Sequence, residues 1–323
     1  MNDLIKSVAV VGAGNLGRRH LQSLSLCKEE FLVYVVDPSS EMIELAIAAT
    51  ANWGKLAERV SYHKNISEIP ENIDIAIVAT TAKHRLAIFS DLINKNTKKI
   101  ILEKVAFNSI DDIKAALSLY DSWGGQAWVN CPRRDYKVYK EIKSMIESPL
   151  IAFKVQGNGY GLACNGIHFI DLAAFLLECD SYIINSLDVT EVLHSKRGGF
   201  IEFCGVLKGE FSSGCIITLE CLTASKGVDY VIELIFDTGT ITLNEITGEL
   251  LINIKGAKKT GKFKMPYQSE LTGPMVDSLL NGNGCPLVDF ESSMNIHRPF
   301  ISSAYEVYSE KFGTNSSKMV PIT

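Results

Sequence analysis

The sequence lacks the features that mark membrane, secreted and nucleic-acid-binding proteins. The apolar segment GIHFIDLAAFLLEC does not reach bilayer-spanning length, because His168 and Asp171 interrupt it. The N-terminus has no basic flank, apolar core and small-residue cleavage site, so we expect no signal peptide. With a net charge of -5 and no stripe of Lys and Arg among aromatic residues, a nucleic-acid partner is not expected. These absences predict a soluble cytoplasmic protein.

Paired cysteines are missing as well. The 8 cysteines include no C-x-x-C pair, and most lie in apolar segments, where a free Cys behaves as a small hydrophobic residue. We expect neither a structural zinc nor a disulfide framework. Asp171, three residues after His168, is interpreted as a structural residue near a helix start. No metal site is therefore predicted.

The chain of 323 residues, with 46% hydrophobic and 21% charged residues, has an ordinary globular composition and a length that suits two domains. Residues 4 to 120 alternate short β-branched runs, such as SVAVVGAG and FLVYVVD, with helical segments. Such alternation predicts an α/β domain with a doubly wound parallel sheet covered on both faces.

A G-x-G-x-x-G pattern follows the first predicted strand and opens the next helix. It consists of Gly12, Gly14 and Gly17 with Asn15 and Leu16 between them. The first glycine permits a tight turn, the second lets the backbone approach a pyrophosphate, and the third allows close helix–strand packing. The pattern alone is weak evidence, but this position between strand and helix is typical of dinucleotide binding.

Asp37 ends the second predicted strand, where a carboxylate accepts hydrogen bonds from the adenosine ribose. The alternative is a strand-end Asp that starts the turn DPSS. A 2'-phosphate would be repelled by this carboxylate, and Pro38, Ser39 and Ser40 provide no compensating cation. We therefore expect NAD(H) as the cofactor rather than NADP(H).

Two later strand ends carry polar residues. Thr80, Thr81 and His84 follow one strand, and Glu103 with Lys104 ends the next. In an open α/β sheet, these ends face the ligand crevice. We expect all five residues to contact the cofactor.

These pieces together resemble the glucose-fructose oxidoreductase, inositol dehydrogenase and rhizopine-catabolism (Gfo/Idh/MocA) family. The resemblance rests on VAVVGAGNLGRRH, V-A-T-x-x-x-H, E-K-V in place of E-K-P, the G-I-H-F-I-D block and the final PLVDFESSMNIHRPFISSAYEVYSE. It covers nearly the whole chain. It implies a Rossmann domain followed by an α+β domain with a large, mostly antiparallel open sheet.

The second half agrees with that implication. Strand patterns such as IEFCGVL, CIITLECL and VDYVIELIF follow one another through short turns, which suits antiparallel pairing. We expect an NAD-binding domain over residues 1–121 and a substrate-binding and oligomerisation domain over residues 122–323. A C-terminal helix at about 291–312 is expected to pack back toward the first domain. The resemblance also implies a homodimer or homotetramer formed through the open sheet.

The resemblance assigns proton transfer to Lys104 and His168. Hydride departure from an alcohol requires that the hydroxyl proton leave as well, and imidazole and amine groups suit that task. The alternatives are a solvent-exposed Lys after a strand and a buried, hydrogen-bonded His at a helix start.

Two positions depart from the family pattern. Val105 stands where the family has a proline, and a cis peptide before a non-proline residue costs about 2.5 to 4 kcal/mol. Cys164 stands where the family has the Asp of D-x-x-x-H, and a neutral thiol stabilises a protonated imidazole poorly. We expect His168 to be a weaker base as a result. A nucleophilic Cys164 is a further alternative.

Substrate contacts are predicted around the start of the second domain. Arg133 or Arg134 can hold a carboxylate or phosphate in a bidentate fork, and a solvated helix start is the alternative. The complete set of predicted substrate contacts is Asn130, Arg133, Tyr136, Tyr160, Cys164 and Asn165.

The sequence thus predicts an NAD(H)-dependent oxidoreductase acting on CH–OH groups. Its substrate is expected to be a sugar, a sugar derivative including nucleotide sugars, or a cyclic polyol. Two alternatives remain open at this point: a dinucleotide-binding, ligand-sensing regulator without turnover, and a reductase of C=N or C=C bonds.

Overall fold

The chain forms two compact units, and neither is continuous in the sequence. The computed structural model describes residues 5–195, 198–223, 227–314 and 318–323. The first unit comprises Met1–Phe107, Lys114–Pro132 and Pro266–Phe290, and the second comprises Asn108–Ile113, Arg133–Met265 and Glu291–Thr323. The first unit therefore extends past the expected division at residues 121 and 122 and takes in a segment that returns from late in the sequence.

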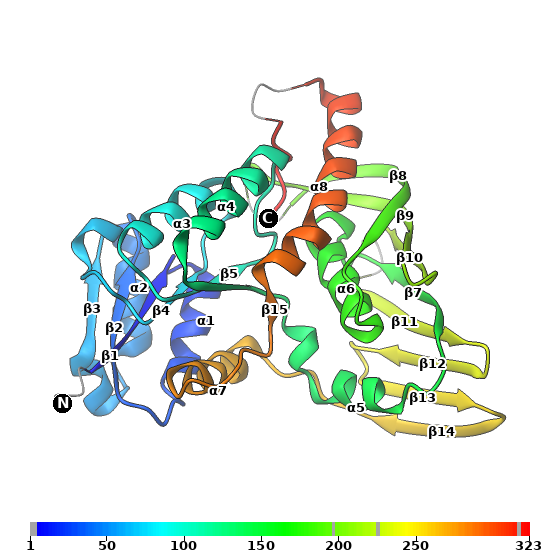
Figure 1. The fold of residues 1–323 in the computed structure, drawn as a ribbon, viewed down its shortest axis with the longest axis horizontal. Helices are drawn as coiled ribbons and strands as arrows, with labels where there is room; N and C mark the ends of the chain where they lie inside the picture. The colour runs from blue at the N-terminus through cyan, green and yellow to red at the C-terminus, as the bar shows by residue number, and fades with distance from the viewer. Residues whose placement is uncertain (1–4, 196–197, 224–226, 315–317) are drawn as a thin grey trace. The chain divides into compact units, whose positions relative to one another are not determined.

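The first unit contains a seven-stranded sheet in the order β15-β6-β5-β4-β1-β2-β3 (Figure 1). Its strands are β1 (Lys6–Val11), β2 (Phe31–Val36), β3 (Val60–His63), β4 (Ile75–Val78), β5 (Lys99–Glu103), β6 (Gln126–Asn130) and β15 (Val288–Asp289). Its helices are α1 (Asn15–Leu24), α2 (Ser40–Thr50), α3 (Arg85–Asn94), most of α4 (Ile110–Trp123) and α7 (Gln268–Leu280), with 3-10 turns η1 (Gly54–Arg59), η2 (Ile66–Glu68) and η3 (Ala82–His84).

The strands from β1 to β6 are parallel, and only β15 pairs antiparallel, with β6. The central strands are apolar throughout, as in Val8–Val11 and Ile75–Val78, and their side chains are buried on both faces of the sheet. Continuous apolar strands are what a parallel sheet covered by helices requires. The predicted doubly wound Rossmann architecture is confirmed.

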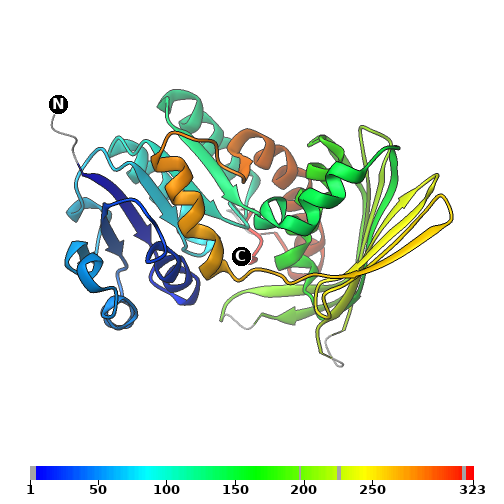
Figure 2. The same cartoon turned by 90° about the horizontal axis from the view of Figure 1, so that it is seen from below.

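Helix α7 completes the first unit although it follows the second unit's strands in the sequence. It packs against α1 (Figure 2). A Cβ on Gly273 would lie 2.4 Å from the carbonyl oxygen of Ser23, and the Gly273 amide donates to the Ser23 Oγ at 2.7 Å. Met275, Val276 and Leu279 extend the sheet's apolar core. The close approach explains the glycine.

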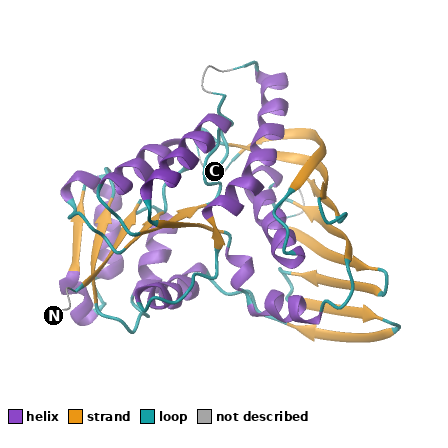
Figure 3. Cartoon of the chain, in the orientation of Figure 1, coloured by secondary structure: helices purple, strands orange, loops and turns teal. Residues whose placement is uncertain are grey.

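The second unit is built on an eight-stranded sheet in the order β14-β13-β12-β11-β7-β10-β9-β8 (Figure 3). Its strands are β7 (Leu150–Asn158), β8 (Tyr182–His194), β9 (Ile201–Phe211), β10 (Ile216–Leu222), β11 (Asp229–Phe236), β12 (Gly239–Asn244), β13 (Glu249–Ile254) and β14 (Ala257–Lys262). Its helices are α5 (Lys137–Met145), α6 (Leu162–Leu177) and nearly all of α8 (Phe290–Phe312), with a 3-10 turn η4 at Pro132–Asp135.

Only the pair β7 and β10 is parallel, so the expectation of a mostly antiparallel sheet is confirmed. The lysine-rich stretch at 255–264 contains the fully exposed edge strand β14. Its lysines stay in solvent on an edge strand, where charge discourages further strand pairing.

Helix α6 covers one face of this sheet, packing on β7, β9 and β10. Its apolar side chains Ile167, Phe169, Ile170 and Leu172 are fully buried. In the part of the chain that the structure describes, no helix is long and apolar enough to cross a membrane.

Candidate functional site

The glycine turn after β1 has the shape expected of a dinucleotide fingerprint. Gly12 has a φ of +98°, and a Cβ there would lie 2.9 Å from the main-chain carbon of Ala79. A Cβ on Gly17 would lie 1.8 Å from the carbonyl oxygen of Gly12. At Gly14, which directly precedes α1, a Cβ would meet no atom of the described residues within 4 Å. The turn therefore leaves open space where the helix N–H groups favour an anion.

Asp37 joins the end of β2 to this turn. Its Oδ2 accepts from the Ala13 amide at 2.7 Å, and its Oδ1 accepts from the Ser39 amide at 2.9 Å. Arg18 braces the same turn by donating to the Ala13 carbonyl at 2.9 Å and to the Asn15 side chain at 2.7 Å. A carboxylate offers about four lone pairs, so Asp37 retains acceptor capacity for ribose hydroxyls.

A hollow of about 510 Å³ opens beside the turn. Gly12, Thr80, Pro38 and Lys64 contribute to its wall from the carboxyl ends of β1, β4, β2 and β3. This is the edge at which open α/β sheets bind ligands, and the volume is typical of a pocket for a small molecule. Together with the open space at Gly14, the hollow fits a dinucleotide. Leu16, half-buried in the first turn of α1, completes the fingerprint.

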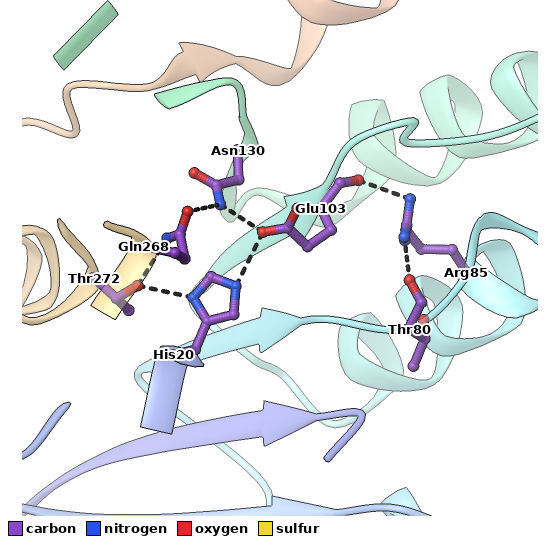
Figure 4. A network of polar contacts seen from close by, with 7 residues as sticks. All are labelled: His20, Thr80, Arg85, Glu103, Asn130, Gln268 and Thr272. Atoms are coloured by element: carbon purple, nitrogen blue, oxygen red, sulfur yellow. Dashed lines mark hydrogen bonds and ion pairs between the residues drawn. The ribbon is translucent and has the colours of Figure 1, made fainter. Parts of the chain in front are cut away.

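A closed ring of five polar side chains surrounds the end of β5 (Figure 4). The Glu103 carboxylate, 4% exposed, lies 3.0 Å from the His20 Nε2 and accepts from the Asn130 amide. The His20 Nδ1 lies 2.8 Å from the Thr272 Oγ1, to which Gln268 donates at 3.1 Å. Asn130 closes the ring by donating to Gln268 at 3.3 Å.

This ring controls the charge of Glu103. Burial by itself raises the pKa of the Glu103 carboxyl, but the hydrogen bond and positive field of His20, the Asn130 amide and the charge of Lys104 together hold that pKa below its ordinary value. Glu103 is therefore an ionised carboxylate directly before Lys104 at neutral pH. The candidate catalytic lysine follows a fixed negative charge.

Arg85 holds the two strand ends from the other side (Figure 4). It is 1% exposed, and its guanidinium donates to the carbonyl oxygens of Glu103 at 2.7 Å and Ala106 at 3.0 Å, and also to those of Val105 and Thr80. One side chain therefore ties the main chain after β4 to the main chain after β5. Five donors in a planar fork make arginine suited to such multiple contacts.

The remaining predicted cofactor contacts lie at the same two strand ends. Lys104 is half-buried, and its peptide bond to Val105 is cis. Thr81 is half-buried before η3, while His84, at the end of that turn, is exposed. Since β4 and β5 are hydrogen-bonded neighbours, the structure brings these residues to one edge of the first unit's sheet.

In the second unit, α6 carries Cys164, His168 and Asp171. Cys164 and His168 are half-buried, whereas Asp171 is 1% exposed and both its carboxylate oxygens accept from the Arg134 Nε, at 2.9 and 2.8 Å. Among the described residues, no group of three or more His, Cys, Asp and Glu side chains is arranged to hold a metal ion. Asp171 thus anchors α6 to Arg134.

Arg133, a predicted substrate contact, belongs to a buried cluster. It donates to both oxygens of Glu245, from Nε at 2.9 Å and from Nη2 at 2.7 Å, and lies 4.6 Å from the centroid of the Phe169 ring. Tyr139 and Tyr230 donate to the same carboxylate. Burial raises the pKa of Glu245, but the Arg133 charge and these hydrogen bonds bring it below its ordinary value. The fork that would bind a substrate carboxylate already binds one from the protein.

Three further predicted contacts lie nearby in the second unit. Asn165 donates to the carbonyl of Tyr160, which fixes the loop before α6. The Tyr160 ring packs edge-on against Phe169 at 5.3 Å, and its buried Oη has no hydrogen-bond partner among the described residues. Tyr136 is half-buried and stacks on Tyr139 at 6.4 Å. These side chains form the surroundings of α6.

Comparison with known proteins identifies the first unit. The model of the Gfo/Idh/MocA oxidoreductases, described as an oxidoreductase family with an NAD-binding Rossmann fold, matches residues 6–131. This domain belongs to the Gfo/Idh/MocA oxidoreductase family. The sequence-based resemblance is confirmed, and so is the expectation of an NAD-binding domain in an oxidoreductase. A search of curated proteins found no match.

Solved structures of the Gfo/Idh/MocA type share the fold over both units. An oxidoreductase from Agrobacterium radiobacter in complex with NAD+, L-tartaric acid and magnesium has 15% identity and a TM-score of 0.71, with 98% of this chain and 99% of that chain covered. UDP-N-acetylglucosamine 3-dehydrogenase GnnA from Acidithiobacillus ferrooxidans has 11% identity and a TM-score of 0.71, covering 96% and 100%. A super-repressor mutant of Gal80p from Saccharomyces cerevisiae has 12% identity and a TM-score of 0.73, covering 98% of each chain. At these identities the likeness shows the fold alone.

The sequence interpretation missed several polar residues of this chain. They are His20, Arg85, Gln268, Thr272 and Glu202. Of these, Arg85 carried a local signal, because a charged residue at the start of an otherwise apolar helix, RLAIFSDLIN, needs buried acceptors. The others act on partners far away in the sequence.

Proposed function

We propose that this chain is an NAD(H)-dependent oxidoreductase that transfers a hydride between nicotinamide and a hydroxyl or keto carbon of a sugar, a sugar derivative or a cyclic polyol. The observation that carries the proposal is the arrangement of side chains at the end of β5, around Glu103 and Lys104. It combines a fixed carboxylate, a candidate proton donor and an immobilised main chain in a domain of an NAD-binding oxidoreductase family.

The residues of the fingerprint account for cofactor binding. When bound, NAD+ supplies the hydride acceptor at nicotinamide C4. Gly14 and the N-terminus of α1 receive the pyrophosphate, and Asp37 accepts from the adenosine ribose. Its carboxylate disfavours a 2'-phosphate. Thr80, Thr81, His84, Glu103 and Lys104 are the proposed contacts to the nicotinamide half.

Lys104 and His168 are the residues proposed to handle the proton. In the oxidation direction, a basic group accepts the hydroxyl proton as the carbon loses hydride, and in reduction an acidic group returns it. Lys104 can hold the substrate oxygen with an ammonium donor, whose charge the neighbouring Glu103 carboxylate supports. Histidine is the side chain whose unperturbed imidazole changes charge near neutral pH, and for that reason His168 is proposed to carry the proton itself.

The substrate class rests on chemistry and on fold neighbours. Among these, GnnA is a dehydrogenase of UDP-N-acetylglucosamine, and the Agrobacterium oxidoreductase was crystallised with tartaric acid, so both names refer to hydroxyl-bearing compounds. Arg133 is engaged with Glu245, and the Asn130 amide is engaged with Glu103 and Gln268. We therefore favour a substrate whose hydroxyl groups meet uncharged side chains over one held by an arginine fork. The proposed contacts are Tyr136, Tyr160, Cys164 and Asn165.

The outer face of the second unit's sheet is the proposed subunit interface. On it lie exposed apolar side chains from four strands, and in Figure 2 the helices α5 and α6 lie on the other face. The register places Ile183, Glu210 and Ile216 next to one another across β8, β9 and β10. The exposed apolar side chains are Ile183, Ile216, Leu222, Val231 and Leu251. A homodimer or homotetramer would bury them.

The first experiment follows nicotinamide absorbance during incubation with a panel of polyols, sugars and nucleotide sugars. We expect turnover with at least one class and a loss of about a hundredfold or more in kcat for Lys104→Ala. The NADH dissociation constant should change far less. Lys83→Ala, an exposed lysine of η3, is the matched control. Full turnover in Lys104→Ala would overturn the assigned role.

The second candidate function is a ligand-sensing regulator without turnover. Cys164, in place of a carboxylate, favours it, and so does the fold likeness to Gal80p, a protein whose mutant is a super-repressor. The panel for this test also includes substrates with C=N and C=C bonds. Tight NAD binding without turnover of any substrate would favour the regulator over the dehydrogenase and over a reductase of C=N or C=C bonds.

A further inference from the structure

The N-terminus of α6 lacks a cap from its own residues. Gly161, the residue before the helix, has a φ of +81° and no side chain, so it leaves the first-turn amides without a local acceptor. The Asn165 amide begins the helical ladder by donating to the Gly161 carbonyl at 2.8 Å. The amides of Ala163 and Cys164 precede that ladder, and buried amides of this kind require a partner from elsewhere.

Glu202 of β9 supplies that partner. Its Oε1 accepts from the Ala163 amide at 2.5 Å, and the Cys164 amide lies 3.2 Å from both carboxylate oxygens. The Phe203 amide also donates to it, at 2.9 Å. A Cβ on Gly161 would lie 2.5 Å from the Glu202 Oε2. The Glu202 carboxylate can therefore reach the first amides of α6 only because residue 161 has no side chain.

We propose that Glu202 is a positioning carboxylate of the reaction site, supplying from β9 the negative charge that position 164 does not provide. The inference rests on the proposed function of His168. His168 lies four residues after Cys164 on the same helix, a rise of about 6 Å. A carboxylate at the start of the helix offsets the positive end of the helix dipole and stabilises an imidazolium one turn later.

The surroundings of Glu202 contain other titratable groups. They are the phenol of Tyr160 and the thiols of Cys164, Cys204 and Cys221, which lie on β10, β9 and the segment that forms α6 and the loop before it. Burial comes first among the influences on Glu202 and raises the pKa of its carboxyl, while the Cys164 thiol and three main-chain amides counteract that effect. Phenols and thiols ordinarily lose a proton only at higher pH than a carboxyl group does, so Glu202 is the group of this cluster that carries a negative charge when it is ionised. Its carboxylate accepts from main-chain amides of Ala163, Cys164 and Phe203, and such hydrogen bonds favour the charged form.

The test is the titration of His168 measured by NMR, in the wild type and in Glu202→Gln. Removing the negative charge should lower the measured His168 pKa by about one pH unit. In the same variant, the acidic limb of kcat/KM for alcohol oxidation should move to lower pH by the same amount, and the plateau should fall several-fold because the base is weaker. Glu141→Gln, at an exposed glutamate of α5 in the same unit, should leave both quantities unchanged.

A second variant keeps the proposal testable if Glu202→Gln does not fold. In Glu202→Gln with Cys164→Asp, the carboxylate returns at the third residue of α6, where an acidic side chain is favourable. It should restore the His168 pKa and the position of the pH limb. Glu202→Ala is the alternative variant without a carboxylate at this helix start. If His168 has the same pKa in the wild type as in Glu202→Gln or Glu202→Ala, whichever of the two folds, the proposal is wrong. If the wild type turns over no substrate, the proposed function fails, and the NMR titration alone decides the role of Glu202.

Discussion

A buried carboxylate, Glu103, and a half-buried one, Glu202, adjoin the residues proposed to carry the chemistry, and the protein holds them with different donors. Glu103 precedes Lys104 and accepts from the side chains of His20 and Asn130. Glu202 adjoins the helix of His168 and accepts mainly from main-chain amides of α6. Burial raises the pKa of both carboxyls, but only around Glu103 do the donors and nearby positive charge outweigh it.

The difference gives the two groups opposite contributions to folding. The folded-state pKa of Glu103 is lowered, so its stabilisation is present above the unfolded-state pKa and is lost as pH falls through the folded-state value. The folded-state pKa of Glu202 is raised, so its contribution is present below the unfolded-state pKa and is lost as pH rises through the folded-state value. At neutral pH, Glu103 therefore stabilises the fold and also places a negative charge beside Lys104. Burial of Glu202 opposes the charged form on which its proposed role depends, so the presence of a carboxylate there argues for a functional reason.

The largest expected effect comes from breaking the Glu103 ring. His20→Leu leaves a buried carboxylate without its main donor, and breaking a buried pair of this kind costs about 3 kcal/mol of unfolding free energy at pH 7. The loss should shrink in acid, because a protonated Glu103 needs the donor less. Urea unfolding of the variant and the wild type, at pH 7 and in acid, measures this loss of unfolding free energy.

His63→Leu is the control for this change, because His63 is half-buried at the end of β3 and lies 3.9 Å from a Glu68 oxygen. It should cost about 1 kcal/mol or less. Equal losses in the two variants, or a loss in His20→Leu that does not depend on pH, would contradict the assigned ionisation of Glu103.

The comparison also separates what the sequence could reveal from what it could not. Gly12, Gly14 and Gly17 were predictable because their roles are local, in a turn between a strand and a helix. Glu103 and Lys104 were predictable as a strand end. The parallel and antiparallel sheets followed from apolar periodicity and turn spacing.

The partners of the two carboxylates were not predictable in the same way. His20 meets Thr272 across 252 residues, and Glu202 reaches Ala163 across 39. In the sequence, His20 is one polar residue in the helix NLGRRHLQSL, and Glu202 is one acidic residue in a strand. Only the return of α7 to the first unit and the packing of α6 on β9 give these residues their partners.

A smaller loss of stability is expected from a change at Thr272, which tests the contribution of the polar ring around His20. Thr272→Val keeps the shape of the side chain but removes the hydroxyl that contacts His20 and Gln268. The buried His20 and the half-buried Gln268 each lose a partner, at a cost of about 1 to 2 kcal/mol of unfolding free energy. Thr97→Val is a matched control, because the buried Thr97 Oγ1 has no hydrogen-bond partner within the described ranges. Thermal unfolding of both variants should separate them by several degrees. Equal midpoints would show that the hydroxyl of Thr272 does not support the ring.

The smallest expected effect has the opposite sign. Glu202→Gln keeps an acceptor for the α6 amides and removes a charge whose folded-state pKa is raised, so the variant should be as stable as the wild type at pH 7 or more stable by up to about 1 kcal/mol. The advantage should disappear in acid, where Glu202 is protonated in both states of the wild type. Urea unfolding of the two proteins across the acid-to-neutral range measures this difference. If Glu202→Gln instead lost stability on going from acid to neutral pH, as His20→Leu is expected to do, the two carboxylates would serve the fold in the same way. A neutral or favourable change, combined with a displaced His168 titration, would mean that the charge of Glu202 is retained for the reaction.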